Sequence, residues 1–550
     1  MGNFLQVFYT IFSAILFALA LPNELLQFGS PICGVCALIP FYMALSRARS
    51  YGRAMRLMML QTLTVHLLSS FWLGFFKDAA ALTLGASAVG TALLSALFGG
   101  LLFVPWAAAT RCIPCDIAQY AAHIPFRILW FPTAYVIWEW VKSSGFLGYP
   151  WGTLSTTAFA WRPVMQIADI TGTYGVTFLF ALFAACVGEW LCSAQWRRSA
   201  HGAARLSERY WQTVTLALIL WTGALLYGLW QYTTVRTPEK YVNAVLVQQN
   251  FDPWRSRNDE PTILLSERLS REHIADFTDS GESTDVVVWS EVVLTHPFPD
   301  AEWYYRTNPP ARPLIPFIAE TGVPFIIGGS YTVDAELYRF QNTAFFFTGD
   351  GVLHNRYGKI HLVPFAEALP GMEIEAVRNF ILDHFGFTGW YPGTSYTRFY
   401  ATARTHPGQP QPDTMVSIAV PICYDDAFPS VIRPFAQLGT ELFINMSDDS
   451  WSRLASAEYQ HFVVAAYRAI ETRTTLVRST NAGYSVVLDP TARILADMPL
   501  FSSTAAAFRI PVYAGEQTAY VWFGNWLPAL CTAIAAVVCL YFIVKQKRRR

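Results

Sequence analysis

Eight long apolar segments divide the sequence, seven in the first 234 residues and the last near the C-terminus. They cover residues 4–21, 30–45, 58–76, 84–107, 127–141, 171–193, 213–231 and 521–544. Each is close to the ~20 residues that an α-helix needs to cross a bilayer. The pattern therefore predicts a polytopic α-helical membrane domain with about eight spans. For the first segment a cleavable signal peptide is the alternative, because small residues precede Pro22 at its end.

Positive charge alternates between the loops that join these segments. The loops after the second, fourth and sixth segments and the C-terminal tail are basic, with Arg47, Arg49, Arg53 and Arg56, then Arg111 and Arg127, then Arg197, Arg198, Arg205 and Arg209, and finally Lys545–Arg550. The intervening loops carry only Lys77, Lys142 and Arg162. Because cytoplasmic loops collect Lys and Arg, both termini are predicted to be cytoplasmic. The segment 235–520 is then predicted on the periplasmic side of an inner membrane.

Between the seventh and eighth apolar segments, strand-like and helix-like patterns alternate. Short apolar, β-branched runs predict strands at 242–248, 285–290, 324–329, 342–347, 415–422, 441–446, 475–479 and 485–489. Amphipathic stretches predict helices at about 259–278, 310–321, 427–438 and 454–473. Strands separated by amphipathic helices are typical of a layered α/β fold.

The composition agrees with a membrane protein. Hydrophobic residues make up 53% of the chain and charged residues 14%, and the mean hydropathy is +0.29. Soluble domains carry about 25% charged residues. The formal net charge is zero, so no nucleic-acid partner is expected.

Nine cysteines are present, and two pairs have the Cys-x-x-Cys spacing, Cys33 with Cys36 and Cys112 with Cys115. Such pairs can bind zinc. The predicted topology places the two pairs on opposite sides of the membrane, and neither has a nearby histidine, so we expect no metal. No organic cofactor is indicated either. Cys423 is the only cysteine of the 235–520 segment.

Glu291 and Cys423 each follow a buried strand pattern, at 285–290 and 416–422. Lys359 lies near the start of a third apolar stretch, 357–367, which ends on Glu367. A cysteine at the end of a strand can occupy a sharp turn, with its sulfur exposed and the next N–H free to bind an oxyanion. A thiol, a carboxylate and an amine that converge there make an activated nucleophile. We expect Glu291 to take the thiol proton, and Lys359 with the Tyr424 N–H to stabilise the oxyanion.

The sequence also allows other interpretations of several residues. His361 and His461 make Cys–His catalysis an alternative. Glu139 lies in or near the hydrocarbon layer, where an acid faces either a protein interior or the interface within a belt of Trp. The Gly- and Pro-containing loop 145–152 is predicted at the outer interface, as part of a shared site. The apolar segment 374–391 is either a glycine-hinged lid that dips into lipid or an ordinary packed helix.

The segment 245–506 resembles the carbon–nitrogen hydrolase (nitrilase) superfamily, whose catalytic Glu, Lys and Cys occur in this chain order. The apolipoprotein N-acyltransferase family, its membrane member, is more specifically similar. The motifs that carry this similarity are Val247–Asn250, Trp289–Glu291, Asn342, Tyr357–Glu367, Ile422–Tyr424, Trp451, Gln460–His461, Arg468, Arg478–Asn481 and Gly483. The eight apolar segments, Glu139–Trp140 and Gly148–Trp151 also match, so the resemblance covers nearly the whole chain.

The resemblance implies a nitrilase-like α-β-β-α sandwich at 235–520, a seven-span membrane domain at 1–234, and a last transmembrane helix with a basic tail at 521–550. It implies acyl transfer from a phospholipid, through a Cys423 thioester, to the α-amine of the diacylglyceryl-cysteine of an apolipoprotein. Glu291 would be the general base and Lys359 the oxyanion stabiliser. Glu367, Tyr424 and Asp425 would have supporting roles.

The sequence departs from the family pattern at four positions near these motifs. Asp425 replaces the usual Glu, Asp448 the usual Asn, Ser452 the usual Phe, and Ala366 the usual Gly. None of them is one of the three catalytic candidates. Two other functions stay open from the residues alone: a membrane-tethered amidase or nitrilase that hydrolyses C–N bonds, and a transporter or receptor whose outer domain only binds a ligand.

Overall fold

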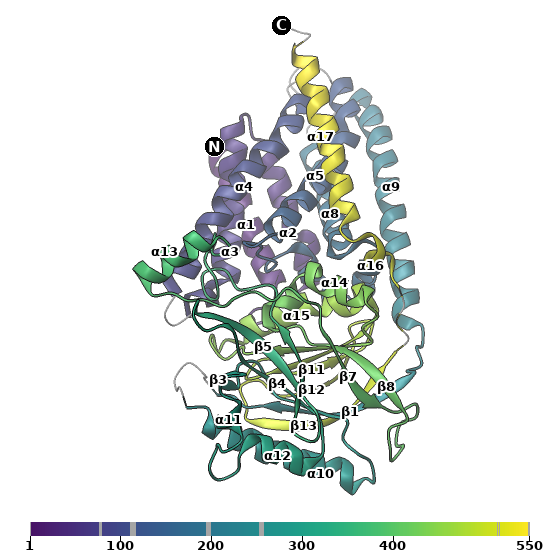
Figure 1. The fold of residues 1–550 in the computed structure, drawn as a ribbon. Helices are drawn as coiled ribbons and strands as arrows, with labels where there is room; N and C mark the ends of the chain where they lie inside the picture. The colour runs from purple at the N-terminus through teal and green to yellow at the C-terminus, as the bar shows by residue number, and fades with distance from the viewer. Residues whose placement is uncertain are drawn as a thin grey trace. The chain divides into compact units, whose positions relative to one another are not determined.

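The computed structural model describes residues 2–75, 80–110, 117–193, 200–251, 258–513, 515 and 517–547. The chain forms two compact units, each with its own set of contacts (Figure 1). The helical unit comprises residues 1–74, 80–234 and 523–550, and the sheet unit comprises 75–79 and 235–522. Of the residues named above, Lys77, Arg111, Cys112, Cys115, Arg197, Arg198 and the last three of the basic tail lie outside the described part.

Helices account for most of the helical unit, and each predicted apolar segment lies largely within one of them. The long helices are α1 Gly2–Ala20, α2 Pro31–Ser46, α3 Tyr51–Ser69, α4 Ala80–Thr110, α5 Ile117–Lys142, α8 Thr173–Cys192, α9 Ala200–Thr233 and α17 Trp526–Lys547. Short turns of helix lie between them: η1 Phe71–Phe75, η2 Leu154–Ala158, α6 Arg162–Met165 and α7 Ala168–Thr171. Helix α5 packs against α8, α9 and α17, which places it inside the bundle.

In the described part, three helical stretches are long and apolar enough to cross a membrane: Asn3–Ala20, Thr173–Cys192 and Glu208–Thr233. Pro31–Ser46, Leu84–Gly100 and Trp526–Phe542 are apolar but shorter. The predicted spans 58–76 and 127–141 fall on α3 and α5. Buried polar side chains, such as Gln61 and Glu139, lower the mean hydropathy of these two helices. The count of eight spans therefore remains a prediction.

Arg127 does not lie in a basic loop, as the charge pattern predicted, but within α5. Its side chain is buried, and its Nε donates to Glu189 Oε2 of α8 over 2.9 Å. The guanidinium also lies over the ring of Trp106, 4.9 Å from its centroid. Arg127 is thus half of an internal ion pair, and it is wrong to count it as a cytoplasmic loop charge.

Two sheets stack face to face in the sheet unit. The first has the strand order β13-β1-β2-β4-β5-β6, with β3 paired to β4, and the second has the order β12-β11-β10-β9-β8-β7. The strands are β1 Lys240–Gln248, β2 Val286–Val288, β3 Leu294–Phe298, β4 Phe325–Asp334, β5 Arg339–Phe347, β6 Leu353–Gly358, β7 Arg398–Ala403, β8 Thr414–Ala419, β9 Leu442–Ser447, β10 Thr475–Thr480, β11 Val486–Leu488, β12 Ile494–Asp497 and β13 Thr504–Val512. Strands β1, β2 and β4 run parallel, as do β8, β9 and β10.

Helices cover both outer faces of this pair of sheets (Figure 1). Helices α10 Glu260–Asp279 and α12 Leu314–Thr321 lie on the first sheet, and α14 Pro429–Gln437 and α15 Ala455–Thr472 lie on the second. The remaining helices are α11 Glu302–Tyr305, α13 Glu375–Phe385, η4 Cys423–Ala427 and α16 Ala519–Phe523. The layers are α-β-β-α, and the predicted layered α/β fold of this part is confirmed.

All eight predicted strands are present, and the described residues form five further strands that the sequence analysis missed. The predicted strand 415–422 ends at Ala419, because Pro421 has no N–H to donate to the ladder. Among the missed strands, β12 alternates between partly buried and exposed residues, and the first four residues of β6 are not buried. In β13, Thr504 is followed by three alanines, which have low strand propensity. These strands form because they pair with neighbours far away in sequence.

Candidate active site

Glu291 follows β2 and is almost fully buried. Its Oε1 accepts hydrogen bonds from Asn342 Nδ2 (2.6 Å) and Lys359 Nζ (3.2 Å). Its Oε2 accepts from the backbone N–H of Asp448 (2.7 Å), which follows β9 of the second sheet. Donors from three separate elements therefore fix the orientation of this carboxylate.

The backbone beside Glu291 is unusual. Val292, a β-branched residue, has a φ of 53°, in the left-handed region that such residues rarely occupy. Gly328 of β4 lies so close that an added Cβ would be 2.4 Å from Ser290 O and 2.7 Å from Glu291 Cα. Gly328 is therefore what allows β4 to pack against the Glu291 turn.

Gly328→Ala is expected to move Glu291, because the nearest atoms are backbone and cannot rotate away. Overpacking of this kind costs about 1–3 kcal/mol of stability. A shift of about 1 Å in a catalytic group can cost on the order of 10²-fold in rate. Turnover and Tm of the variant check this, beside Gly515→Ala, where an added Cβ meets no described atom within 4 Å. Wild-type turnover in Gly328→Ala would contradict the expected displacement.

Lys359 lies just after β6, and its side chain is 1% exposed. Its Nζ donates to Glu291 Oε1 and, over 2.8 Å, to Glu367 Oε1. Burial opposes its charge, but Cys423, Glu291 and Glu367 outweigh burial and raise the pKa of the Lys359 ammonium well above its usual value. Lys359 is therefore a permanent cation between two carboxylates.

Cys423 occupies the turn between β8 and the short helix η4, with a φ of 47°. The side chain of Asn445 clamps this turn, because its Nδ2 donates to the carbonyls of Pro421 (3.2 Å) and Cys423 (3.1 Å). Burial and the nearby Glu291 raise the pKa of the Cys423 thiol, while Lys359 lowers it. At rest the sulfur is a neutral thiol, so it needs a base. The sheet unit thus brings the three predicted residues into one electrostatically coupled cluster.

The predicted supporting residues surround this cluster. Glu367 Oε2 accepts from the N–H of Val363 (2.7 Å), which holds the carboxylate against Lys359. The ring of Tyr424 packs on Phe428, with centroids 4.8 Å apart. Both are placed to shape the surroundings of Lys359 and Cys423.

Asp425 is fully buried and ties the Cys423 turn to the Lys359 loop. Its Oδ1 accepts from the His361 N–H (2.7 Å), and its Oδ2 from the Tyr357 hydroxyl (2.9 Å) and the Ile422 N–H (3.1 Å). Burial raises the pKa of Asp425 to about 6. Asp425 is one methylene shorter than the glutamate usual at this position in the family, and three hydrogen-bond donors hold its carboxylate.

Neither histidine is placed as the base of a Cys–His pair. His461 lies between two carboxylates, with Nδ1 3.1 Å from Asp449 Oδ1 and Nε2 3.0 Å from Asp426 Oδ1. Arg478 donates to the other oxygens of the same two aspartates. His361 stacks on Phe428 instead, and burial lowers its pKa to about 4.

Sequence reasoning did not predict this buried network of Asp426, Asp449, His461 and Arg478. The sequence analysis gave His461 as part of a motif and as a candidate for Cys–His catalysis, and Arg478 only as part of a motif. The two aspartates follow Asp425 and Asp448 directly. The network connects Asp426 of η4, three residues after Cys423, with His461 of α15 and Arg478 of β10. In the sequence, the sign of this network is that charged residues occur within or next to otherwise apolar strand and helix patterns.

Asp448 is buried, and its Oδ1 accepts from Asn481 Nδ2 (2.7 Å) and the Ser450 N–H (3.2 Å). Burial raises the pKa of Asp448 to about 7, and Glu291 adds to this effect. The folded-state pKa is above the unfolded value, so the folded protein loses stability as the pH rises from about 4 to 7.

Asp448→Asn is expected to remove this loss, because an amide oxygen still accepts both hydrogen bonds and carries no charge. The gain in stability at pH 8 is on the order of a few kcal/mol at most. Tm measured at pH 5 and pH 8 for wild type and variant tests it. The variant should gain most at pH 8 and clearly less at pH 5; equal effects at both pH values would contradict the titration of Asp448.

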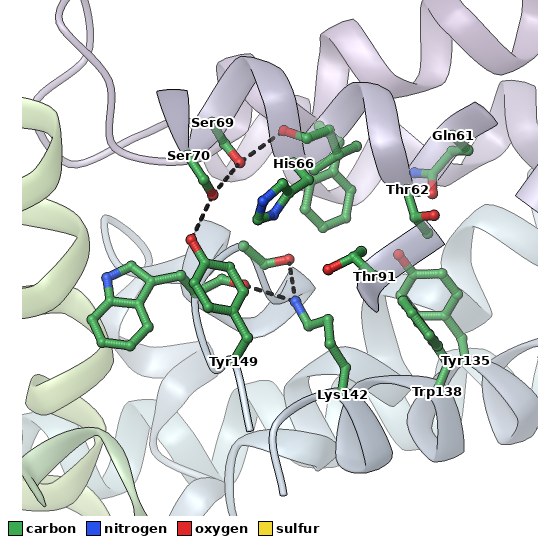
Figure 2. A pocket seen from close by; sticks show the side chains of 14 residues that line it. Gln61, Thr62, His66, Ser69, Ser70, Thr91, Tyr135, Trp138, Lys142 and Tyr149 are labelled. Carbon is green, nitrogen blue, oxygen red and sulfur yellow. Dashed lines mark hydrogen bonds between the residues drawn. The ribbon is translucent and has the colours of Figure 1, made fainter. Parts of the chain in front are cut away.

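In the helical unit, Glu139 faces the protein interior rather than the membrane interface. It is 2% exposed and accepts hydrogen bonds from the Leu154 N–H and the Thr177 hydroxyl, each 2.5 Å long. Lys142, one turn further along α5, donates to the carbonyls of Trp151 (2.7 Å) and Gly152 (3.1 Å) (Figure 2). These contacts tie the loop 145–152 to α5.

The same loop closes one side of a polar cavity of about 370 Å³, its open mouth included. Figure 2 shows Lys142 and Tyr149 facing His66, Ser69 and Ser70 of α3 and the turn after it, and the Tyr149 hydroxyl donates to Ser70 Oγ over 2.7 Å. All residues that line it belong to the helical unit. The loop is therefore built into the helical unit, and its predicted part in a shared site stays a prediction.

The segment 374–391 forms the helix α13, followed by Gly386 in the left-handed conformation. Three of its large apolar residues are exposed, Ile374 by 55%, Phe380 by 54% and Phe385 by 72%. Arg378 of the same helix is buried and donates to Met372 O. The segment is a helix with exposed apolar side chains, so it is not fully packed on the sheet unit.

Two protein-family models match this chain. A carbon–nitrogen hydrolase family model matches residues 244–518, which cover both sheets and the Glu291–Lys359–Cys423 cluster. The sheet unit therefore has the nitrilase-like fold. The model for the apolipoprotein N-acyltransferase N-terminal domain matches residues 13–186 of the helical unit.

Full-length relatives define the family. The chain is 38% identical to apolipoprotein N-acyltransferase 2 of Treponema denticola, over 100% of this chain and 99% of the relative. It is 35% identical to apolipoprotein N-acyltransferase 2 of Treponema pallidum, over 95% of this chain and 92% of the relative. The chain belongs to the apolipoprotein N-acyltransferase family, and it is an acyltransferase with a carbon–nitrogen hydrolase catalytic domain. This favours acyl transfer over the amidase and the ligand-binding alternatives.

Proposed function

We propose that the protein transfers a fatty acyl chain from a membrane phospholipid to the α-amine of the N-terminal diacylglyceryl-cysteine of lipoproteins. Family membership supports the reaction type and the lipoprotein acceptor. The observation that carries the proposal is the cation Lys359, shared by Glu291 and Glu367 beside the partly exposed Cys423.

In the first half-reaction, Glu291 takes the Cys423 proton and the thiolate attacks the ester carbonyl carbon of the phospholipid. Lys359 and the Tyr424 N–H stabilise the oxyanion of the tetrahedral intermediate. Its collapse breaks the ester C–O bond, and Glu291 returns the proton to the leaving lysophospholipid. A Cys423 thioester remains.

In the second half-reaction, the acceptor amine attacks the thioester carbonyl carbon. A C–N bond forms, the C–S bond breaks, and Glu291 passes the one proton that the nitrogen loses to the departing thiolate. Lys359 stabilises this second oxyanion in the same position. The products are a triacylated lipoprotein and the free thiol.

We also propose the membrane arrangement: eight spans in the inner membrane, both termini cytoplasmic and the sheet unit on the periplasmic side. The charges of Arg47, Arg49, Arg53 and Arg56 near the end of α2 and the start of α3 support this orientation. The exposed apolar side chains of Ile374, Phe380 and Phe385 suit a segment that dips into lipid, where both substrates have their acyl chains.

Mass spectrometry of the acceptor tests the function. Purified protein, phosphatidylethanolamine micelles and a synthetic diacylglyceryl-cysteine peptide should give a peptide heavier by one fatty acyl group. A peptide with an acetylated N-terminus should gain nothing. Release of free fatty acid with no peptide acylation would contradict the proposal and favour a hydrolase.

A further inference from the structure

A second, small cavity lies within the sheet unit beside Glu291, with room for about one water-sized group behind its open mouth. Its polar lining comes from Asn258, Asp259 and Thr262 at the start of α10, from Ser290 and Glu291 after β2, and from Thr295 and Asn481. The proposed base thus forms one wall of this cavity, and the start of α10 forms another.

Asp259 is 1% exposed, and its two oxygens have different surroundings. Oδ2 accepts from the Thr295 N–H (2.9 Å) and the Tyr305 hydroxyl (2.8 Å), and His296 Nδ1 lies 3.4 Å away. Oδ1 has no hydrogen-bond partner among the described residues. The Thr262 hydroxyl, 5% exposed, has no described partner either.

Buried carboxylate and hydroxyl oxygens without partners are costly, because they lose the hydrogen bonds that water would give. Two acceptors in one cavity, one of them negatively charged, match a ligand with several N–H donors and a positive charge. An ammonium group has three donors and no acceptor. The chemistry of these two oxygens therefore selects a protonated amine.

We propose that Asp259 and Thr262 bind the protonated α-amine of the acceptor and deliver it to Glu291. This inference rests on the proposed function, in which such an amine must reach the thioester. A free α-amine has a pKa of about 8, so at neutral pH the acceptor arrives mainly as an ammonium ion.

The ammonium ion donates hydrogen bonds to Asp259 Oδ1 and Thr262 Oγ1 and loses one proton to the Glu291 carboxylate. The resulting amine attacks the thioester carbonyl carbon, and a C–N bond forms as the C–S bond breaks. The second proton passes to the Cys423 thiolate, and Glu291 releases its proton to water. Asp259 changes neither its protonation nor its bonds.

The test separates the two half-reactions, using the full-length protein. Asp259→Asn keeps an oxygen for the Thr295 and Tyr305 hydrogen bonds but removes the charge. The KM for the diacylglyceryl-cysteine peptide should rise at least about tenfold at pH 7, while the rate of acyl-enzyme formation from phospholipid stays within about twofold of wild type. At pH 9.5, where the amine is neutral, the difference in KM should shrink. Thr262→Val should raise KM by a smaller factor, about threefold.

Hydroxylamine serves as a small, neutral nucleophile, and it should discharge the acyl-enzyme of wild type and Asp259→Asn at the same rate. Asp276→Asn, an exposed carboxylate on the same helix, is the matched control and should behave as wild type. An unchanged KM in both variants, or an equal fall of both half-reactions, would overturn the inference. A wild type that forms no acyl-enzyme would instead overturn the proposed function, so the two failures are distinct.

Discussion

Cys423→Ala is expected to reduce peptide acylation by at least about 10³-fold, because no other described group near Glu291 and Lys359 can form the thioester. The thiol is small and partly exposed at the start of η4, so its loss should change Tm little. Initial rates of peptide acylation and Tm, measured on the same preparation, check both parts.

The control for this change is Cys539→Ala, which removes another partly exposed thiol, from α17. It should retain the wild-type rate. If Cys423→Ala kept more than a few per cent of the activity at an unchanged Tm, acyl transfer would not pass through this sulfur.

Lys359→Met is expected to cost about 3–5 kcal/mol of stability and most of the activity. The ammonium is the cation between Glu291 and Glu367, and all three side chains are at least 86% buried. Methionine matches the length of the lysine stem but leaves two buried carboxylates facing each other. One of them must then take a proton, so the loss of Tm should be larger at pH 8 than at pH 5.

Lys240→Met is the matched control for this substitution. Lys240 pairs with Glu441 over 2.5 Å, but the two side chains are 21% and 30% exposed, and water screens the pair. Such a pair is worth about 0–1 kcal/mol. Equal destabilisation by the two substitutions, with no dependence on pH, would show that the Lys359 cluster is not a charge-compensated site.

The central strands and the three catalytic candidates could be predicted because their signals are local. Each strand is a short β-branched run, and Glu291 and Cys423 each follow such a run, where carboxyl ends of parallel strands gather. The edge strands β12 and β13 lack that pattern and are specified by their pairing partners. Sequence alone therefore describes the core of the sheet unit better than its edges.

The features that sequence did not reveal depend on contacts between distant residues. In the sequence, Arg127 cannot be told from the arginines of the basic loops. Only its ion pair with Glu189, 62 positions away, shows that it is internal. Asp259 precedes Glu291 by a helix and a strand, and no pattern along the chain indicates that both line one cavity. Hydropathy alone does not give the number of membrane spans for a related reason, since buried polar groups such as Gln61 on α3 and Glu139 on α5 lower the mean hydropathy of these helices.

Intact mass of the purified protein after incubation with phospholipid micelles tests the central claim most directly. The wild type should gain the mass of one fatty acyl group, hydroxylamine should remove it, and the diacylglyceryl-cysteine peptide should discharge it to its amine. Cys423→Ala should gain no mass. A wild type that acylates the peptide without ever carrying the acyl group, or an acyl group that persists in Cys423→Ala, would contradict a thioester on Cys423.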